Sequence, residues 1–156
     1  MTRRRTSLAA LALAIVIPAG VYLLAGDRLF GVHDADPTNA KQVARGQRVY
    51  VDNCAVCHGD HLQGQPDWRT RKPDGRLPAP PHDESGHTWH HPDQQIFEMT
   101  KFGLQPFAPP GYQSDMPAFG GKLSDDEIWA VLAYIKSAWP EDVRARQARL
   151  NAQAQK

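Results

Sequence analysis

Both cysteines of this chain lie in one five-residue stretch, Cys54-Ala55-Val56-Cys57-His58. Two thiols three positions apart can each form a thioether with one of the two vinyl groups of haem, and the adjacent imidazole can then bind the iron. A haem held in this way becomes the central packing element of a small domain. The stretch therefore predicts one covalently attached haem c, with Cys54 and Cys57 as anchors and His58 as an iron ligand.

Two other kinds of site use the Cys-x-x-Cys spacing. A zinc site needs four ligands, usually from a second Cys or His pair, and the chain has no further cysteine to supply one. A thioredoxin-like dithiol would lie within a βαβ pattern, which the flanking sequence lacks. Haem attachment is therefore the interpretation that we adopt.

Residues 1–26 are predicted to be a signal peptide or an uncleaved membrane anchor. Three arginines at positions 3–5 precede an apolar run from Leu8 to Ala25. As a helix, this run would span about 27 Å, which is short for a membrane helix but longer than most signal-peptide cores. A cut near the end of the run would place leucine at the third position before it, which favours the anchor. The remaining chain is then expected on the periplasmic side of the bacterial inner membrane, anchored or secreted.

The rest of the chain is long enough for one domain. We predict a linker at 27–37, the haem domain at 38–139 and an exposed helical tail at 140–156. All 17 acidic residues lie after residue 26, as do all but three of the 18 lysines and arginines. Because this part is nearly neutral, nucleic acid is not expected as a partner, and redox-partner proteins are expected to bind a local patch around the haem edge.

The first predicted helix lies directly before the cysteine motif. Thr38 or Asn39 can cap it, and it runs to about Asn53. Glycine inside a helix costs about 1 kcal/mol relative to alanine, so Gly46 indicates that another backbone packs close to this position. The predicted packing face of this helix consists of Val43, Gly46, Tyr50 and Val51.

Two further helices are predicted after the motif. One opens at residues 91–93, with proline at the first helical position, and ends before Gly103. The other opens with a capping box at residues 124–127. Its apolar stripe must be buried, and the first helix is the expected partner. The stripe consists of Ile128, Val131, Leu132, Ile135 and Trp139.

Residues 59–91 are rich in glycine and proline and show no periodicity, so they are predicted to form a loop. A loop of this length needs something to organise it, and the haem would supply the missing core. We therefore expect the haem-free protein to lack stable tertiary structure.

Met116 is the predicted second axial ligand. It precedes Pro117, whose fixed φ holds the loop chain beside the thioether. Met99 fits an ordinary core position in a helix and is the weaker candidate, and a histidine or an open site is the remaining option. A His/Met pair raises the reduction potential and fills the iron coordination, which favours electron transfer over catalysis.

Taken together, these motifs resemble class I cytochrome c, the monohaem cytochrome c family, over residues 38–139. The order of the motifs along the chain is specific to that family. The resemblance is carried by Gly46, Tyr50, Cys54, Cys57, His58, Met116, Pro117, Phe119, Leu123 and the stripe that begins at Glu127.

The resemblance implies an all-α cytochrome c fold, with three or more helices around the haem. It implies that the N- and C-terminal helices cross near Gly46 and Tyr134, and that His58 and Met116 are the axial ligands. It also implies a proline carbonyl that accepts a hydrogen bond from the proximal histidine. The candidates for this carbonyl are Pro80 and Pro81.

The segment from His82 to His91 contains four of the seven histidines. Clustered imidazoles can bind copper or another transition metal, which makes this loop a candidate second metal site. The alternative, which we favour, is that these side chains cap the helix that follows, bond the haem propionates or lie in solvent, while Trp89 packs on the ring edge.

The expected function is electron transfer without enzymatic activity. The protein would carry single electrons on the periplasmic side of the membrane, between a dehydrogenase or quinol-oxidising complex and a terminal acceptor. One alternative is a haem-bearing subunit of a periplasmic oxidoreductase complex, docked through the tail after Pro140 or the loop at 82–91. A further alternative is a haem or copper sensor that uses the same loop.

Overall fold

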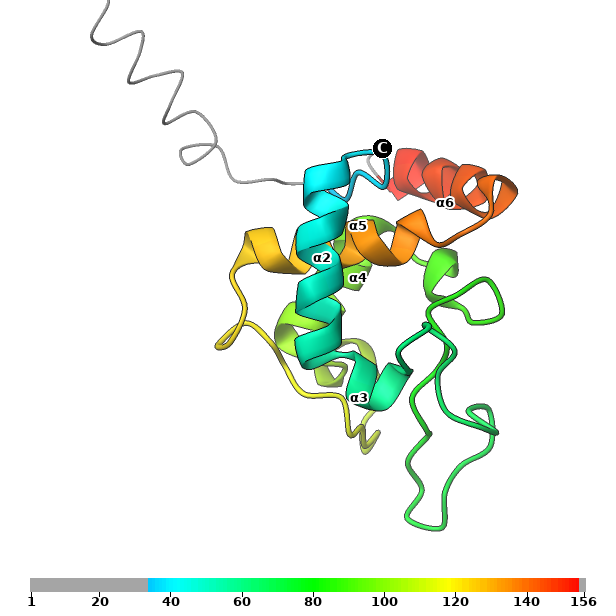
Figure 1. Ribbon diagram of the computed structural model, residues 1–156. Coiled ribbons are helices and arrows are strands. Elements are labelled where there is room, and N and C mark those ends of the chain that lie inside the picture. Colours follow the sequence, from blue (N-terminus) through cyan, green and yellow to red (C-terminus); the bar gives the residue numbers. More distant parts are fainter. Residues whose placement is uncertain (1–33, 155–156) are drawn as a thin grey trace, which may run out of the picture. The chain divides into compact units, whose positions relative to one another are not determined.

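Helices joined by loops make up residues 34–154, the part of the chain that the computed structural model describes (Figure 1). No strand occurs among these residues, so the predicted all-α class is confirmed for them. No helix within this part is both long enough and apolar enough to span a membrane. The predicted hydrophobic segment at 1–26 lies outside the described residues.

The three helices predicted from the sequence are all present. The elements in chain order are α2 (Ala40–Asn53), α3 (Ala55–His58), η1 (Thr88–His90), α4 (Asp93–Phe102), η2 (Gln105–Phe107), α5 (Asp125–Ser137) and α6 (Glu141–Ala154). The start of α4 differs by one position from the prediction, since Pro92 has an extended backbone and caps the helix rather than beginning it. The loop from residue 59 onward is interrupted only by η1 before α4 begins.

α2 and α5 cross and pack against each other, as Figure 1 shows. The Asn39 side chain caps α2 by accepting hydrogen bonds from two backbone N–H groups of its first turn. At the crossing, a Cβ atom on Gly46 would lie 1.9 Å from the carbonyl oxygen of Ala130. The ring of Tyr50 is fully buried, with its centroid 5.3 Å from that of Tyr134. The close backbone approach predicted from Gly46 is therefore confirmed.

The predicted packing face of α2 is wrong at one position. Val51 is 57% exposed, whereas Val49 is buried. The cause is helix geometry, because Val49 and Tyr50 follow Gly46 by three and four positions and share its face. Val51 lies about 100° further round the helix and faces solvent.

α5 is the most buried helix of the described domain. The capping box is complete, since the Ser124 side chain accepts from the N–H of Glu127 and the Glu127 carboxylate accepts from the N–H of Ser124. Every residue of the predicted stripe is buried. Trp129 is buried as well and stacks on Phe97 of α4, with ring centroids 4.5 Å apart. α5 therefore joins α2 and α4 into one core.

α6 forms as predicted, but it is not exposed along its whole length. Val143 and Gln147 are buried. Gln147 and Asn151 both donate hydrogen bonds to the Asp93 carboxylate at the start of α4. Lys136 of α5 forms an ion pair with the same carboxylate. α6 thus packs on the domain through polar contacts at Asp93. The apolar periodicity used to predict buried helix faces cannot reveal such contacts.

Replacing Asp93 with alanine is expected to destabilise the haem-containing protein by about 3 kcal/mol, because it leaves Lys136 without its partner. The side chain of Lys136 is only 10% exposed and that of Asp93 only 16%. Urea unfolding followed by far-ultraviolet dichroism measures the change. Asp52→Ala, at an exposed position of α2, is the control and should cost less than about 0.5 kcal/mol. Equal losses in the two variants would show that the contact does not hold α6.

Candidate functional site

Cys54, Cys57 and His58 occupy the turn that follows α2. The Cys54 carbonyl accepts from the N–H groups of Cys57 and His58, at 3.1 and 2.9 Å, and closes the single turn of α3. Residues at positions i, i+3 and i+4 of a helical turn lie on one side of it, so the structure brings the three predicted side chains together. Both thiols are free, that of Cys57 exposed and that of Cys54 half-buried. Burial raises the pKa of the Cys54 thiol to about 11.

The imidazole of His58 is buried and held in one orientation. Its Nδ1 lies 2.8 Å from the carbonyl oxygen of Pro80. A carbonyl can only accept, so Nδ1 must carry the proton and Nε2 keeps its lone pair. Burial lowers the pKa of His58, while the hydrogen bond to Pro80 acts in the opposite direction. Of the two predicted prolines, Pro80 is therefore the one that orients His58.

The loop after His58 is folded back so that Pro80 reaches the imidazole. The N–H of Gln65 donates to the carbonyl of Ala79 at 2.9 Å, and the N–H of Gly64 donates to that of His58 at 2.8 Å. Gly64 has a φ of +68°, and a Cβ atom there would lie 2.4 Å from the nitrogen of Pro81. Only glycine satisfies both the left-handed backbone and this close approach.

His82 is a part of the site that the sequence analysis missed. Its ring stacks on that of His58, with centroids 4.0 Å apart and 23° between the planes. Its Nδ1 lies 2.8 Å from the Thr88 hydroxyl, and its carbonyl accepts from the indole N–H of Trp139 at 2.7 Å. His82 thus supports one face of the His58 imidazole. Its position two residues after Pro80 was the available signal.

Tyr50 also contributes to the site beyond its place in the helix crossing. Its hydroxyl donates to the carbonyl of Gly59 at 2.8 Å, directly after the cysteine motif. Burial raises the pKa of this hydroxyl, so it remains protonated and able to donate. The bond connects α2 to the end of the turn that carries His58.

Of the remaining histidines of the loop at 82–91, His87 and His91 meet edge to face with centroids 5.7 Å apart, and each has a further partner of its own. His87 stacks on Trp68, His90 stacks on Trp89, and Nδ1 of His91 lies 3.2 Å from the Gln95 side chain. Among residues 34–154, no group of three or more His, Cys, Asp or Glu side chains is arranged to hold a metal ion. The structure therefore does not bring the loop histidines together as a metal cluster.

Met116 is half-buried in the loop between η2 and α5. Its N–H donates to the Ser114 hydroxyl at 3.0 Å. Further along, the loop is attached to α4, since the N–H of Phe119 donates to the carbonyl of Thr100 at 3.0 Å. Met99 is half-buried on α4 itself. These contacts place Met116 in the predicted loop and leave its ligand role as a prediction.

The donor set of the site fits a covalently attached haem. Cys54 and Cys57 are unpaired thiols on one turn. His58 offers a neutral nitrogen, because its other ring nitrogen is occupied by the Pro80 carbonyl. Such a set would hold haem through two thioethers and one iron–imidazole bond.

Comparison with known proteins agrees with this geometry. Residues 43–139 match the family model described as Cytochrome c. A thiosulfate dehydrogenase of Stutzerimonas stutzeri is 33% identical over 111 residues, which are 69% of this chain and 31% of that protein. The cbb3-type cytochrome c oxidase subunit FixP of Bradyrhizobium diazoefficiens is 31% identical over 96 residues, 60% of this chain and 29% of that protein.

A smaller relative is matched over most of its length. Cytochrome c6 of a Picosynechococcus species is 30% identical over 125 residues, 80% of this chain and 89% of that protein. By contrast, the chain spans about a third of the length of the thiosulfate dehydrogenase and of FixP. No solved structure matches the chain at a comparable level.

Proposed function

The chain belongs to the cytochrome c family, as a class I electron-transfer protein with covalently bound haem c, and from this premise we propose the roles of its residues. Cys54 and Cys57 anchor the haem, and His58 and Met116 are the axial iron ligands. Bound in this way, the haem iron supplies one-electron redox chemistry.

The observation that carries the proposal is the hydrogen bond from His58 to Pro80. It fixes the tautomer, holds the ring against rotation and leaves Nε2 free for iron, as outer partners of metal-bound histidines do. His82 on the ring face adds a steric restraint. A ligand held this rigidly suits electron transfer, since little of the site has to rearrange when the charge on iron changes.

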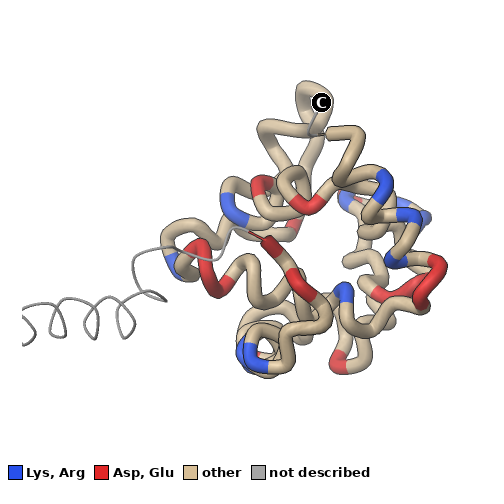
Figure 2. The backbone as a smooth tube through the Cα atoms, turned by 90° about the horizontal axis from the view of Figure 1, so that it is seen from above, with Lys and Arg blue, Asp and Glu red and all other residues tan. Residues whose placement is uncertain are grey.

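We further propose that the protein works on the periplasmic side of the inner membrane, with residues 1–26 as export signal or anchor. Its partners would be a dehydrogenase or quinol-oxidising complex and a terminal acceptor. Figure 2 shows basic and acidic residues interspersed along the described chain. Such mixing supports recognition through a local patch rather than long-range steering.

A second candidate is a haem-bearing subunit of a larger periplasmic oxidoreductase. The observation that favours it is that thiosulfate dehydrogenase and FixP each match this chain over about a third of their length. In such an assembly, the same ligands would pass electrons to or from a catalytic partner. Isolation of the protein from membranes, followed by crosslinking near the haem edge, distinguishes a stable subunit from a freely exchanging carrier.

Replacing Met116 with alanine is expected to remove the far-red ferric absorption band that reports an iron–methionine bond. The reduction potential should fall by on the order of 100 mV, because a soft thioether stabilises ferrous iron. The ferrous variant should also bind carbon monoxide, which the wild type, with both axial positions filled, should not bind. Absorption spectroscopy and a redox titration measure these changes.

The matched control is Met99→Ala, which removes the same side chain from α4. It should keep the far-red band and exclude carbon monoxide. The opposite pattern in the two variants would transfer the ligand role to Met99. Carbon monoxide binding by the wild type would contradict the carrier function and favour an enzyme or sensor.

A further inference from the structure

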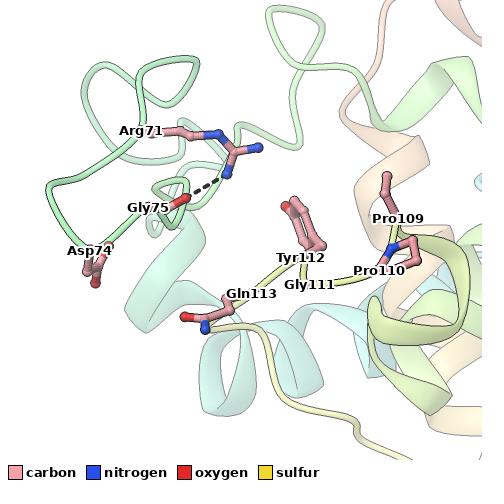
Figure 3. A pocket seen from close by; sticks show the side chains of 8 residues that line it. All are labelled: Arg71, Asp74, Gly75, Pro109, Pro110, Gly111, Tyr112 and Gln113. Carbon is pink, nitrogen blue, oxygen red and sulfur yellow. Dashed lines mark hydrogen bonds between the residues drawn. The ribbon is translucent and has the colours of Figure 1, made fainter.

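Residues 71–76 form a short loop that faces the segment before Met116, and we call this loop the basic strap. We call residues 108–124, between η2 and α5, the Met116 loop. The strap and the Met116 loop line an open cavity of about 440 Å³. Figure 3 shows Arg71 of the strap and Tyr112 of the Met116 loop facing each other there. The Arg71 guanidinium lies 5.8 Å from the centroid of the Tyr112 ring. The strap and the Met116 loop are about 40 residues apart in sequence, so this proximity comes from the fold.

Two ion pairs connect the strap to the residue that precedes Met116. The Lys72 ammonium lies 2.7 Å from Oδ2 of Asp115, and the Arg76 guanidinium lies 2.5 Å from Oδ1. Both oxygens of one carboxylate are therefore used by cations from the strap. Since Asp115 is bonded directly to Met116 along the chain, the strap restrains the backbone at the proposed ligand.

The other contacts around Met116 are local or lie on its far side. The Ser114 hydroxyl accepts from the N–H of Met116 within the same turn. The attachment of the loop to α4 begins at Phe119, three residues later. Pro117, directly after Met116, has no N–H to donate. On the N-terminal side of Met116, Gln105 bonds the Tyr112 carbonyl and the strap contacts both Tyr112 and Asp115, of which Asp115 is the nearer to Met116 and carries the two ion pairs.

The backbone of the strap is closed on itself, which fixes the positions from which Lys72 and Arg76 reach Asp115. The Arg71 guanidinium donates to the carbonyl of Gly75 at 2.6 Å, and the N–H of Lys72 donates to the carbonyl of Arg76 at 2.8 Å. A backbone that is already ordered loses less conformational entropy when its side chains form a contact. Among the described side chains, Nε of Arg76 is buried without a hydrogen-bond partner. The Lys72, Arg76 and Asp115 side chains are 38%, 40% and 43% exposed, so these are surface pairs, but two cations share one carboxylate and form a small network rather than an isolated pair.

We propose that the basic strap positions Met116. Its two ion pairs with Asp115 would keep the methionine bound to iron and lower the rate at which the iron–methionine bond opens. This inference rests on the proposed ligand role of Met116. The cations touch neither iron nor haem in this scheme, and they act through the loop backbone. Removing these cations or their partner should therefore change the rate at which an external ligand replaces the methionine.

The test is the rate of imidazole binding to the ferric haem-containing protein, measured by stopped-flow absorption. Imidazole can bind only after Met116 leaves, so the rate reports the opening of the loop. Asp115→Asn is expected to raise this rate by about fivefold, while the far-red band and the helical dichroism are kept. The wild-type rate should rise with ionic strength, because salt screens partly exposed pairs, whereas the rate of the variant should not.

Two variants serve as controls. Asp74→Asn removes one negative charge from the strap itself, where its side chain accepts from the N–H of Arg76, and asparagine retains that acceptor. Its rate and salt dependence should match those of the wild type. Asp115→Glu keeps the charge and should restore most of the wild-type rate.

The outcomes separate this inference from the ligand assignment. If the wild type shows the far-red band but Asp115→Asn matches it in rate and salt dependence, the strap does not position Met116. If Asp74→Asn accelerates binding as much as Asp115→Asn does, the effect is one of net charge and the inference is equally wrong. A wild type without the band would overturn the assignment of Met116, and the strap with it.

Discussion

Replacing Gly46 with alanine is expected to destabilise the haem-containing protein by about 4 kcal/mol or more. Alanine is the better helix former by about 1 kcal/mol, so the prediction runs against helix propensity. The new Cβ atom would lie 1.9 Å from the carbonyl oxygen of Ala130 and 2.9 Å from Cβ of Tyr134. A backbone group cannot rotate away as a side chain can, so α2 and α5 would have to separate along the most buried contact of the domain.

Guanidinium unfolding, followed by haem absorption and far-ultraviolet dichroism, measures this loss. Gly121→Ala is the matched control, since it makes the same chemical change where a Cβ atom would have no neighbour within 4 Å. That variant should stay within about 0.5 kcal/mol of the wild type. Similar stability of the two variants would mean that the helices cross elsewhere.

Replacing both Cys54 and Cys57 with alanine is expected to abolish covalent haem attachment and stable tertiary structure together. The buried apolar cluster is drawn almost entirely from the helices, and Leu62 is the member that it takes from residues 59–87. Ordering this long loop costs conformational entropy. Without haem, the loop buries too little apolar surface to offset that cost. Under the proposed attachment, the two free thiols on one turn hold the haem that supplies the core of this loop.

Haem staining after denaturing electrophoresis tests the attachment, and near-ultraviolet dichroism tests the tertiary structure. Val56→Ala is the control, because Val56 lies between the two cysteines and is 86% exposed. It should retain the haem and the native spectrum. A cysteine-free protein that unfolds cooperatively, with native near-ultraviolet dichroism, would contradict the central packing role of haem.

The features that could be predicted from the sequence have local causes. The capping box at Ser124 and the cap at Asn39 were predicted because each joins groups two or three residues apart. The glycine at position 46 was informative because glycine is costly inside a helix. The motif at Cys54–His58 could be recognised for the same reason, since its chemistry needs only five consecutive residues, and its role in attachment stays a prediction.

The features that were missed join segments far apart in the chain. Asp93 meets Gln147 and Asn151 across more than 50 residues, and the contact is polar, so no apolar period marks it. Asp115 meets the strap across about 40 residues. His82 was grouped with its neighbours in sequence, whereas its structural partner is His58. The roles of Asp93, Asp115 and His82 therefore become visible only in the folded structure.

The junction of Gln65 with Ala79 has a consequence for how this domain can vary. The two residues exchange hydrogen bonds, since the N–H of Gln65 donates to the Ala79 carbonyl and the N–H of Ala79 donates to the Gln65 side chain. The segment between them, residues 66–78, includes the strap. Because its two ends are bonded to each other, it forms a closed loop whose start and end lie side by side. Doubling the length of such a segment costs only about 0.6 kcal/mol of loop entropy, so it can be extended beyond the Trp68–His87 stack while the Pro80 carbonyl stays on His58. Under the proposed ligand roles, the two axial bonds can therefore vary independently. The iron–His58 bond stays constant, while changes in the segment that carries the strap adjust the iron–Met116 bond.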